Sequence, residues 1–214
     1  MQVFYYLSKS NFAADPNSLY VFFGGGNDIR DASLLAPAER TQAATVAAYN
    51  MVLSAYALGQ YGARRFLFMN SPDIGLTPEA RIVRNNAAAA TAATVQYNQA
   101  LAYLAGNLSF TNQQIFQFDT FNLLNVLYQD ALTGGTHFGI TNATLPCFPG
   151  FAGSPGADCS KSLFADDIHP TAITQSLLAL AVNNQVHNPE PATIGLTGAA
   201  LMVLGWYKRR RKAS

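Results

Sequence analysis

The clearest indication of the fold class is the segment Leu19-Tyr20-Val21-Phe22-Phe23, which is followed by Gly24-Gly25-Gly26. It is a short, continuous apolar run rich in strand-forming residues. A run of this kind, bounded by turn signals, predicts a buried strand of a parallel sheet rather than a half-exposed one. The stretch 65–70 has the same character, and the stretch 114–119 alternates as a third strand.

Helical spacing of apolar and small residues separates and follows these strands. The expected helices lie at 37–60, at 78–106 with an interruption near residue 85, at 120–132 and at 171–186. Asp119 or Thr120 is expected to cap the third of them. The alternation of strand and helix implies right-handed crossovers and helices on both faces of the sheet. The predicted fold class is therefore α/β, a three-layer α/β/α domain around a parallel sheet that spans residues 1–186.

The charge distribution argues against a nucleic-acid partner. The 214-residue chain has a formal net charge of +1, but five of its 13 basic residues form the run 208–212. Residues 1–190 then hold eight basic and all 12 acidic residues, a net of −4. A mildly acidic body does not suit a phosphate backbone. The sequence also has no phosphate loop, nucleotide fingerprint or convincing metal cluster, so no cofactor and no metal are expected.

Two cysteines, Cys147 and Cys159, lie at the ends of a loop rich in Pro, Gly and Ser. An even number of cysteines in one loop favours a disulfide over a reactive thiol, and hence an oxidising compartment. They belong to an irregular region, 134–163, which leads directly into the stretch 164–171. Long irregular segments inside a compact domain are usually functional or covalently stapled. The first residues show no basic start and no long apolar run, so no signal peptide is visible there.

The stretch 164–171 contains Asp166 and His169, three residues apart, with Pro170 directly after the histidine. Pro170 favours an extended conformation at His169 and suits the first turn of the helix that follows. A carboxylate at this distance can hold Nδ1–H and leave Nε2 free to accept a proton from a serine hydroxyl. The alternative is an aspartate that caps a helix beside an exposed histidine. The two other histidines, His137 and His187, are expected to be surface residues.

Gly25-Gly26-Asn27-Asp28 lies just past the end of the first predicted strand. Ligands bind outside the carboxyl ends of strands in open parallel sheets. Glycines at such an end let the backbone approach a ligand, and an asparagine amide is a suitable oxyanion donor. Alone, the motif is more often a tight turn than an active site. Its combination with Asp-x-x-His-Pro at the other end of an α/β domain strengthens the functional interpretation.

These two motifs together resemble the SGNH/GDSL esterase–lipase family over residues 1–186. The resemblance implies that Asn27 is an oxyanion-hole donor, that His169 is the general base and that Asp166 orients it, with Asp167 as the competing carboxylate. It also implies that Gly25 and Gly26 line the substrate site. The looser stretches 72–78 and 118–121 are similar to connecting segments of the bacterial branch that includes autotransporter esterases.

The chain departs from the family pattern at the nucleophile. The family's first block, Gly-Asp-Ser, normally precedes the Gly-x-Asn-Asp strand, and this sequence contains no Gly-Asp-Ser. Ser8, Ser10 and Ser18 precede Asn27, but none has the strand-to-turn context with a glycine neighbour. No residue of this chain is therefore assigned as nucleophile. A sheet without the family's first strand would leave an apolar edge uncovered. We expect a truncated gene model or a gene remnant.

The last residues differ in character from the domain. Residues 187–191 form a proline-punctuated linker, and residues 192–207 are an almost wholly apolar stretch, about 24 Å long as a helix against roughly 30 Å for a bilayer core. The basic run 208–212 follows and would stay on the cytoplasmic side. The segment 192–214 resembles a PEP-CTERM sorting signal. This resemblance implies a membrane segment, an exosortase-type sorting enzyme as partner, and export to the envelope or the outside of a Gram-negative-type bacterium.

Two functions follow from the sequence. The first is an exported serine esterase or lipase that cleaves carboxylic esters, of small molecules or of lipids, through an acyl-enzyme. The second is a non-catalytic surface or binding protein built on a remnant of the same fold. Loss of a triad nucleophile typically costs about 10⁶ in kcat, so the chain as printed is expected to be nearly inert.

Overall fold

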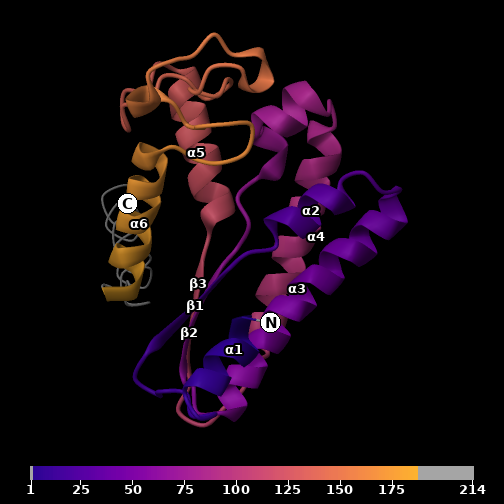
Figure 1. Cartoon of the computed structure of the whole chain (residues 1–214), viewed down its shortest axis with the longest axis vertical. Helices are drawn as coiled ribbons and strands as arrows, with labels where there is room; N and C mark the ends of the chain where they lie inside the picture. Colours follow the sequence, from indigo (N-terminus) through magenta and orange to yellow (C-terminus); the bar gives the residue numbers. More distant parts are fainter. Residues whose placement is uncertain (1, 188–214) are drawn as a thin grey trace, which may run out of the picture. The chain divides into compact units, whose positions relative to one another are not determined.

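The computed structural model describes residues 2–187 (Figure 1). The chain divides into two compact units, Met1–Leu178 and Ala179–Ser214, and all strands and all helices before α6 belong to the first. The strands are β1 (Leu19–Phe23), β2 (Arg65–Met69) and β3 (Gln114–Phe118). The helices are α1 (Gln2–Lys9), α2 (Gly26–Ala32), α3 (Pro37–Gln60), α4 (Ala87–Gly106), α5 (Thr120–Leu132) and α6 (Ala172–His187). Four short helical segments complete the described chain: η1 (Ile74–Leu76), η2 (Glu79–Val83), η3 (Phe151–Gly153) and η4 (Cys159–Lys161).

The sheet is parallel, with the strand order β1-β2-β3. The register is flush, since Leu19 lies opposite Arg65 and Arg65 opposite Gln114, and the pairing continues to the last residue of each strand. All three strands therefore end at one level, and the residue after each strand lies along one edge of the sheet. The predicted strands and the α/β class are confirmed.

The main core lies between the sheet and α3 and α4. Phe22, Phe66 and Phe68 pack together on this face, and the rings of Phe22 and Phe68 stack with centroids 5.2 Å apart. Small side chains on the helices, among them Ala44 and Ala93, are fully buried. Alanines at the contact let the helix backbones come close to each other and to the aromatic layer.

The edge strand β1 is partly uncovered. Val21 and Phe23 point to the face opposite the core and are 54% and 49% exposed. Within residues 2–187, no strand pairs with the outer side of β1. An edge strand with exposed apolar side chains is a site where another strand can add. The uncovered apolar edge expected from the sequence is therefore present in the described part of the chain.

Two helical segments differ from the prediction. Helix α2 begins at Gly26, so Asn27 lies in a first helical turn and not in a simple loop. The expected helix 78–106 is divided: η2 is a single π-helical segment, Asn85 has φ +52°, and α4 begins at Ala87. The expected interruption near residue 85 is thus confirmed. Asp119 caps α5 by accepting a hydrogen bond from the Asn122 N–H at 3.0 Å.

A disulfide cross-links the irregular region 134–163. Cys147 and Cys159 form a disulfide, as the sequence predicted. Two backbone hydrogen bonds lie next to the disulfide. The Ala157 N–H donates to the Cys147 carbonyl at 2.9 Å, and the Cys147 N–H donates to the Phe164 carbonyl at 3.0 Å. The loop is therefore fixed directly against the stretch that carries Asp166 and His169. A second apolar cluster beside it combines α5 side chains with Leu163 and Phe164.

The expected membrane and sorting segment, 192–214, lies outside the described residues. Among residues 2–187, no helix combines the length and the apolar character needed to cross a membrane.

Candidate active site

The first part of the candidate site is the turn from β1 into α2. Gly25 precedes the helix with φ +88°, a left-handed conformation that favours glycine. The Tyr97 ring packs directly on Gly25, and its hydroxyl donates to the Gly24 carbonyl at 3.1 Å. Burial, assisted by the Asp28 charge, raises the pKa of Tyr97 to about 12, so it remains a hydroxyl donor. Gly26 differs, because a Cβ added there would meet no atom within 4 Å.

The second part is the loop that carries Asp166 and His169. Nδ1 of His169 lies 2.8 Å from Oδ2 of Asp166. The other carboxylate oxygen, Oδ1, accepts from the His169 N–H at 2.7 Å and from the Ile168 N–H at 2.8 Å. The imidazole is 73% exposed. Asp166 therefore holds the ring from one side, and Nε2 is left facing solvent.

The pKa values of the two neighbouring aspartates are shifted in opposite directions. Burial is the largest influence on Asp166 and acts to raise its pKa, but the hydrogen bonds from His169 and Ile168 outweigh it and lower the pKa. Burial raises the pKa of Asp167, followed by the charges of Asp166 and Glu79. Asp167 also has a buried Oδ1 without a hydrogen-bond partner. The geometry thus selects Asp166 as the histidine's partner.

An ion pair connects the two parts. Arg30 donates to both carboxylate oxygens of Glu79, at 2.7 and 2.6 Å, and its Nη1 donates to Oδ1 of Asn27 at 3.1 Å. The Glu79 N–H donates to the Asp167 carbonyl at 2.8 Å. This chain of contacts runs from Asn27 to the Asp166–His169 loop. It brings together the two motifs that the sequence singled out.

The ion pair also orients Asn27. A guanidinium only donates, so Arg30 must face the amide oxygen of Asn27, and the amide Nδ2 is left as a donor. The hydrogen bond to Arg30 lowers the pKa of Glu79, and the same bond raises that of Arg30. Sequence reasoning missed both residues, which are 49 positions apart; only the position of Arg30 one helical turn after Asn27 hinted at its role.

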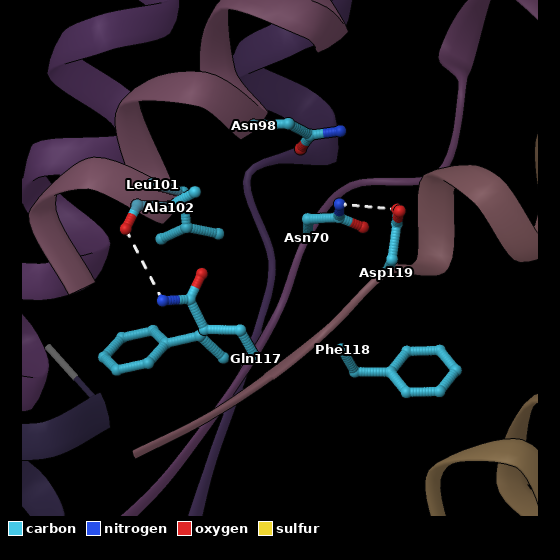
Figure 2. A pocket seen from close by; sticks show the side chains of 8 residues that line it. Asn70, Asn98, Leu101, Ala102, Gln117, Phe118 and Asp119 are labelled. Atoms are coloured by element: carbon cyan, nitrogen blue, oxygen red, sulfur yellow. Dashed lines mark hydrogen bonds between the residues drawn. The ribbon is translucent and has the colours of Figure 1, made fainter. Parts of the chain in front are cut away.

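Other polar side chains at the carboxyl edge are already paired. A cavity of about 220 Å³ lies beside the ends of β2 and β3. At this cavity Asn70 Nδ2 donates to Asp119 Oδ1 at 2.9 Å (Figure 2). Asn98, on its α4 wall, exchanges two hydrogen bonds with Ser71. The cavity lining includes neither Asn27 nor His169. These amides stabilise the edge of the sheet and do not form the candidate site.

A second aspartate–histidine pair lies at the end of α5. Nδ1 of His137 is 2.7 Å from Oδ1 of Asp130, and that carboxylate also accepts from the N–H groups of His137 and Phe138. The His137 imidazole is exposed, as the sequence predicted. The pair shows that the Asp–His contact alone does not identify a catalytic site in this chain. What distinguishes Asp166–His169 is its connection to Asn27.

The nucleophile remains unassigned within this chain. Ser8 and Ser10 donate to carbonyls of their own helix, and Ser18 donates to Asp15. Among the described residues, no serine hydroxyl is hydrogen-bonded to His169. No group of three or more His, Cys, Asp or Glu side chains suited to a metal ion occurs among residues 2–187.

Comparison with known proteins gives consistent matches. The family model described as GDSL-like Lipase/Acylhydrolase matches residues 1–182. The chain is 32% identical over 178 residues to an uncharacterized protein in the trpE-trpG intergenic region of Pseudomonas putida, covering 78% of this chain and 28% of that protein. It is 37% identical over 78 residues to Lipase 1 of Photorhabdus luminescens, covering 36% of this chain and 12% of that protein. The chain therefore spans less than a third of either relative.

Proposed function

The chain belongs to the GDSL-like lipase/acylhydrolase family, and we propose that it supplies the oxyanion donor and the acid–base pair of a serine ester hydrolase. The observation that carries the proposal is the Arg30–Glu79 connection between Asn27 and the Asp166–His169 loop.

In the proposed reaction, Nε2 of His169 removes the proton from a serine hydroxyl while the serine oxygen attacks the ester carbonyl. Asp166 accepts the Nδ1 hydrogen bond and stabilises the imidazolium that forms. The carbonyl oxygen becomes an oxyanion, to which Nδ2 of Asn27 donates. His169 then returns the proton to the leaving alcohol, which leaves an acyl-enzyme. A water molecule, activated by the same histidine, releases the acid.

The serine comes, in this proposal, from a segment that is not part of the 214 residues. The open edge of β1 supports this, because no strand of the described residues pairs with the outer side of β1 and a further strand could pair there. A strand added beside β1 would end at the same level as the existing three. Its following turn would then lie next to Gly24, at the edge where Asn27 is found.

The test expresses the chain together with the coding sequence that precedes it in the genome, and measures hydrolysis of a chromogenic ester. We expect His169→Ala to lower kcat by about 10⁴-fold or more and Asn27→Ala by about 10²- to 10³-fold. His137→Ala is the matched control, since it removes the second Asp-paired imidazole, and it should retain activity. Equal losses in the His169 and His137 variants would refute the assignment.

A second candidate function is a non-catalytic surface protein of the same fold. The absence of a serine bonded to His169 in the described residues favours it for the chain as printed. A fluorophosphonate probe, which labels activated serines, separates the two functions. Labelling of the natural product that is lost in His169→Ala supports the enzyme. A product that shows no labelling supports the non-catalytic protein.

We further propose that the protein is exported to the cell envelope. The Pro189-Glu190-Pro191 motif, the apolar stretch after it and the basic run 208–212 resemble a PEP-CTERM signal read by an exosortase-type enzyme. The Cys147–Cys159 disulfide is consistent with an oxidising compartment. Mass spectrometry of the protein from a strain with an active sorting enzyme tests this proposal. Full retention of residues 192–214 would contradict it.

A further inference from the structure

The long helix α3 carries a line of exposed side chains on an outer edge of the first unit (Figure 1). Its four apolar members are about half exposed: Val46 is 50%, Tyr49 52%, Leu53 46% and Tyr56 47% exposed. An exposed glutamine continues the line at each end. We call the set the α3 stripe; it consists of Gln42, Val46, Tyr49, Leu53, Tyr56 and Gln60.

The members of the α3 stripe are spaced alternately by four and three residues. Apolar side chains with this spacing form the contact line of a coiled coil, because they all face one neighbouring helix. The opposite side of α3 already packs in the core through small side chains such as Ala44, Ala48 and Ala55. The α3 stripe is therefore a second packing face of the same helix, and its spacing suits a helix as the partner.

The α3 stripe is complementary to itself when two copies run antiparallel. With a twofold axis at the level of residue 51, each member meets the member equally far on the other side of the axis. The resulting pairs are Gln42–Gln60, Val46–Tyr56 and Tyr49–Leu53. Each tyrosine then meets an aliphatic side chain, and the glutamines meet each other at both ends. A parallel pair would place each tyrosine beside its own copy, which packs large and small side chains less evenly.

Charge does not oppose contact between two copies along α3. Residues 41–63 contain no charged side chain. Like charges that face each other across an interface are strongly unfavourable, and a helix face without charges avoids this repulsion from its own copy. Since the contact has no ion pairs, added salt should not weaken it.

The size of the α3 stripe indicates how strong the association is. From residue 42 to residue 60 the helix rises about 27 Å. Half the circumference of an α-helix over this length is on the order of 450 Å², or roughly 900 Å² for two copies. Interfaces of this size belong to transient complexes. The expected dimer is therefore weak and reversible.

We propose that the α3 stripe is a homodimer interface, in which α3 packs antiparallel against α3 of a second copy. The four-three spacing selects a helix as the partner. The match between the two halves of the stripe and the lack of charge select a second copy of this chain. The stripe includes neither Asn27 nor the Asp166–His169 pair, so the proposal goes beyond the proposed function and does not depend on it.

The test uses the full chain, in which the apolar stretch 192–207 offers a second route to self-association. The readout must therefore be local. Both native cysteines are held in the disulfide, so a cysteine introduced on the surface is the sole free thiol for a short bis-maleimide cross-linker.

The position of the introduced cysteine distinguishes the possible arrangements. Asn50 is exposed beside the α3 stripe at the level of the twofold axis, so Asn50→Cys places two thiols next to each other. Gln42→Cys places them about 27 Å apart along the helix axis, but next to position 60 of the other copy. The control is Tyr103→Cys on α4, where the replaced side chain is 71% exposed.

We expect a cross-linked dimer with Asn50→Cys and none with Gln42→Cys alone. A mixture of Gln42→Cys and Gln60→Cys should form a cross-linked heterodimer. Tyr103→Cys should give about tenfold less dimer than Asn50→Cys. Adding Leu53→Asp to Asn50→Cys should lower the cross-linked fraction by about tenfold or more, because two carboxylates then meet near the axis. Circular dichroism confirms that the variants are folded.

Three results would overturn the proposal. Equal cross-linking of Asn50→Cys and Tyr103→Cys would show association that does not use the α3 stripe. Cross-linking of Gln42→Cys with itself would show a parallel pair. A monomeric Asn50→Cys protein at its highest soluble concentration would leave the stripe to a different partner or to solvent. None of these measurements involves ester hydrolysis, so their outcome is independent of the proposed function.

Discussion

Replacement of Gly25 by alanine should destabilise the protein strongly, for two reasons that can be counted from the structure. Gly25 has φ +88°, and the left-handed conformation costs a residue with a Cβ about 1 kcal/mol or more. The added Cβ would also lie 2.6 Å from two ring carbons of Tyr97, a fully buried side chain. Overpacking of this kind costs about 1 to 3 kcal/mol. The two effects together predict a loss of about 2 to 4 kcal/mol in the free energy of unfolding.

The neighbouring residue provides the control. Gly26→Ala places a Cβ where no atom lies within 4 Å, at the first position of α2. It should change the free energy of unfolding by less than about 1 kcal/mol, in the stabilising direction, because alanine restricts the unfolded chain. Urea unfolding followed by circular dichroism measures both variants. If Gly25→Ala is as stable as Gly26→Ala, the close packing on Tyr97 and the conformational argument are both wrong.

Two further predictions concern the ion pair and the disulfide. Arg30 lowers the pKa of Glu79 below its ordinary value of 4.5, so the ionised pair stabilises the fold fully above pH 4.5 and this stabilisation is lost as the pH falls through the lowered value. Glu79→Gln should therefore lower the free energy of unfolding by about 1 to 2 kcal/mol at pH 7, a range that already allows for the partial exposure of the pair. Below pH 4.5 the stability of the variant should depend less on pH than that of the unaltered protein. Parallel curves of stability against pH for the two proteins would contradict this. Joint replacement of Cys147 and Cys159 by serine opens a loop with a sequence separation of 12. It should lower the free energy of unfolding, measured by urea titration, by about 3 kcal/mol. An unchanged urea midpoint would show that the hydrogen bonds of the loop hold it without the disulfide.

The elements that depend on local pattern could be predicted from the sequence. All three strands agree with their expected ranges to within one residue, because each is an apolar run or an alternating stretch between turn residues. The helix 37–60 agrees at both ends, where Pro37 begins it and Gly62 follows it. The three-residue spacing also pointed to Asp166 rather than Asp167, and the structure has the imidazole on Asp166.

What could not be predicted depends on contacts between distant residues. Helix α2 has glycine at its N-cap and no side-chain cap, so the usual start signal is missing. Arg30 and Glu79 meet only because the crossover through α3 and β2 brings η2 back beside α2. The interruption near residue 85 was expected, but the π-helical form of η2 was not; Glu79 at its start is held by Arg30 and by the Asp167 carbonyl. No local pattern contains this information.

Charged side chains are unevenly distributed along the chain. Residues 41–63 and 85–118 contain no charged side chain, and these ranges hold most of α3 and all of α4 and β3. The side chains of α4, of β3 and of most of α3 are therefore uncharged. Ionic strength and acid act on groups that titrate or attract counterions, and the charged side chains of this unit lie outside these two ranges. A change of pH or of salt concentration thus acts on the charged segments and has little direct effect on α4, on β3 and on most of α3.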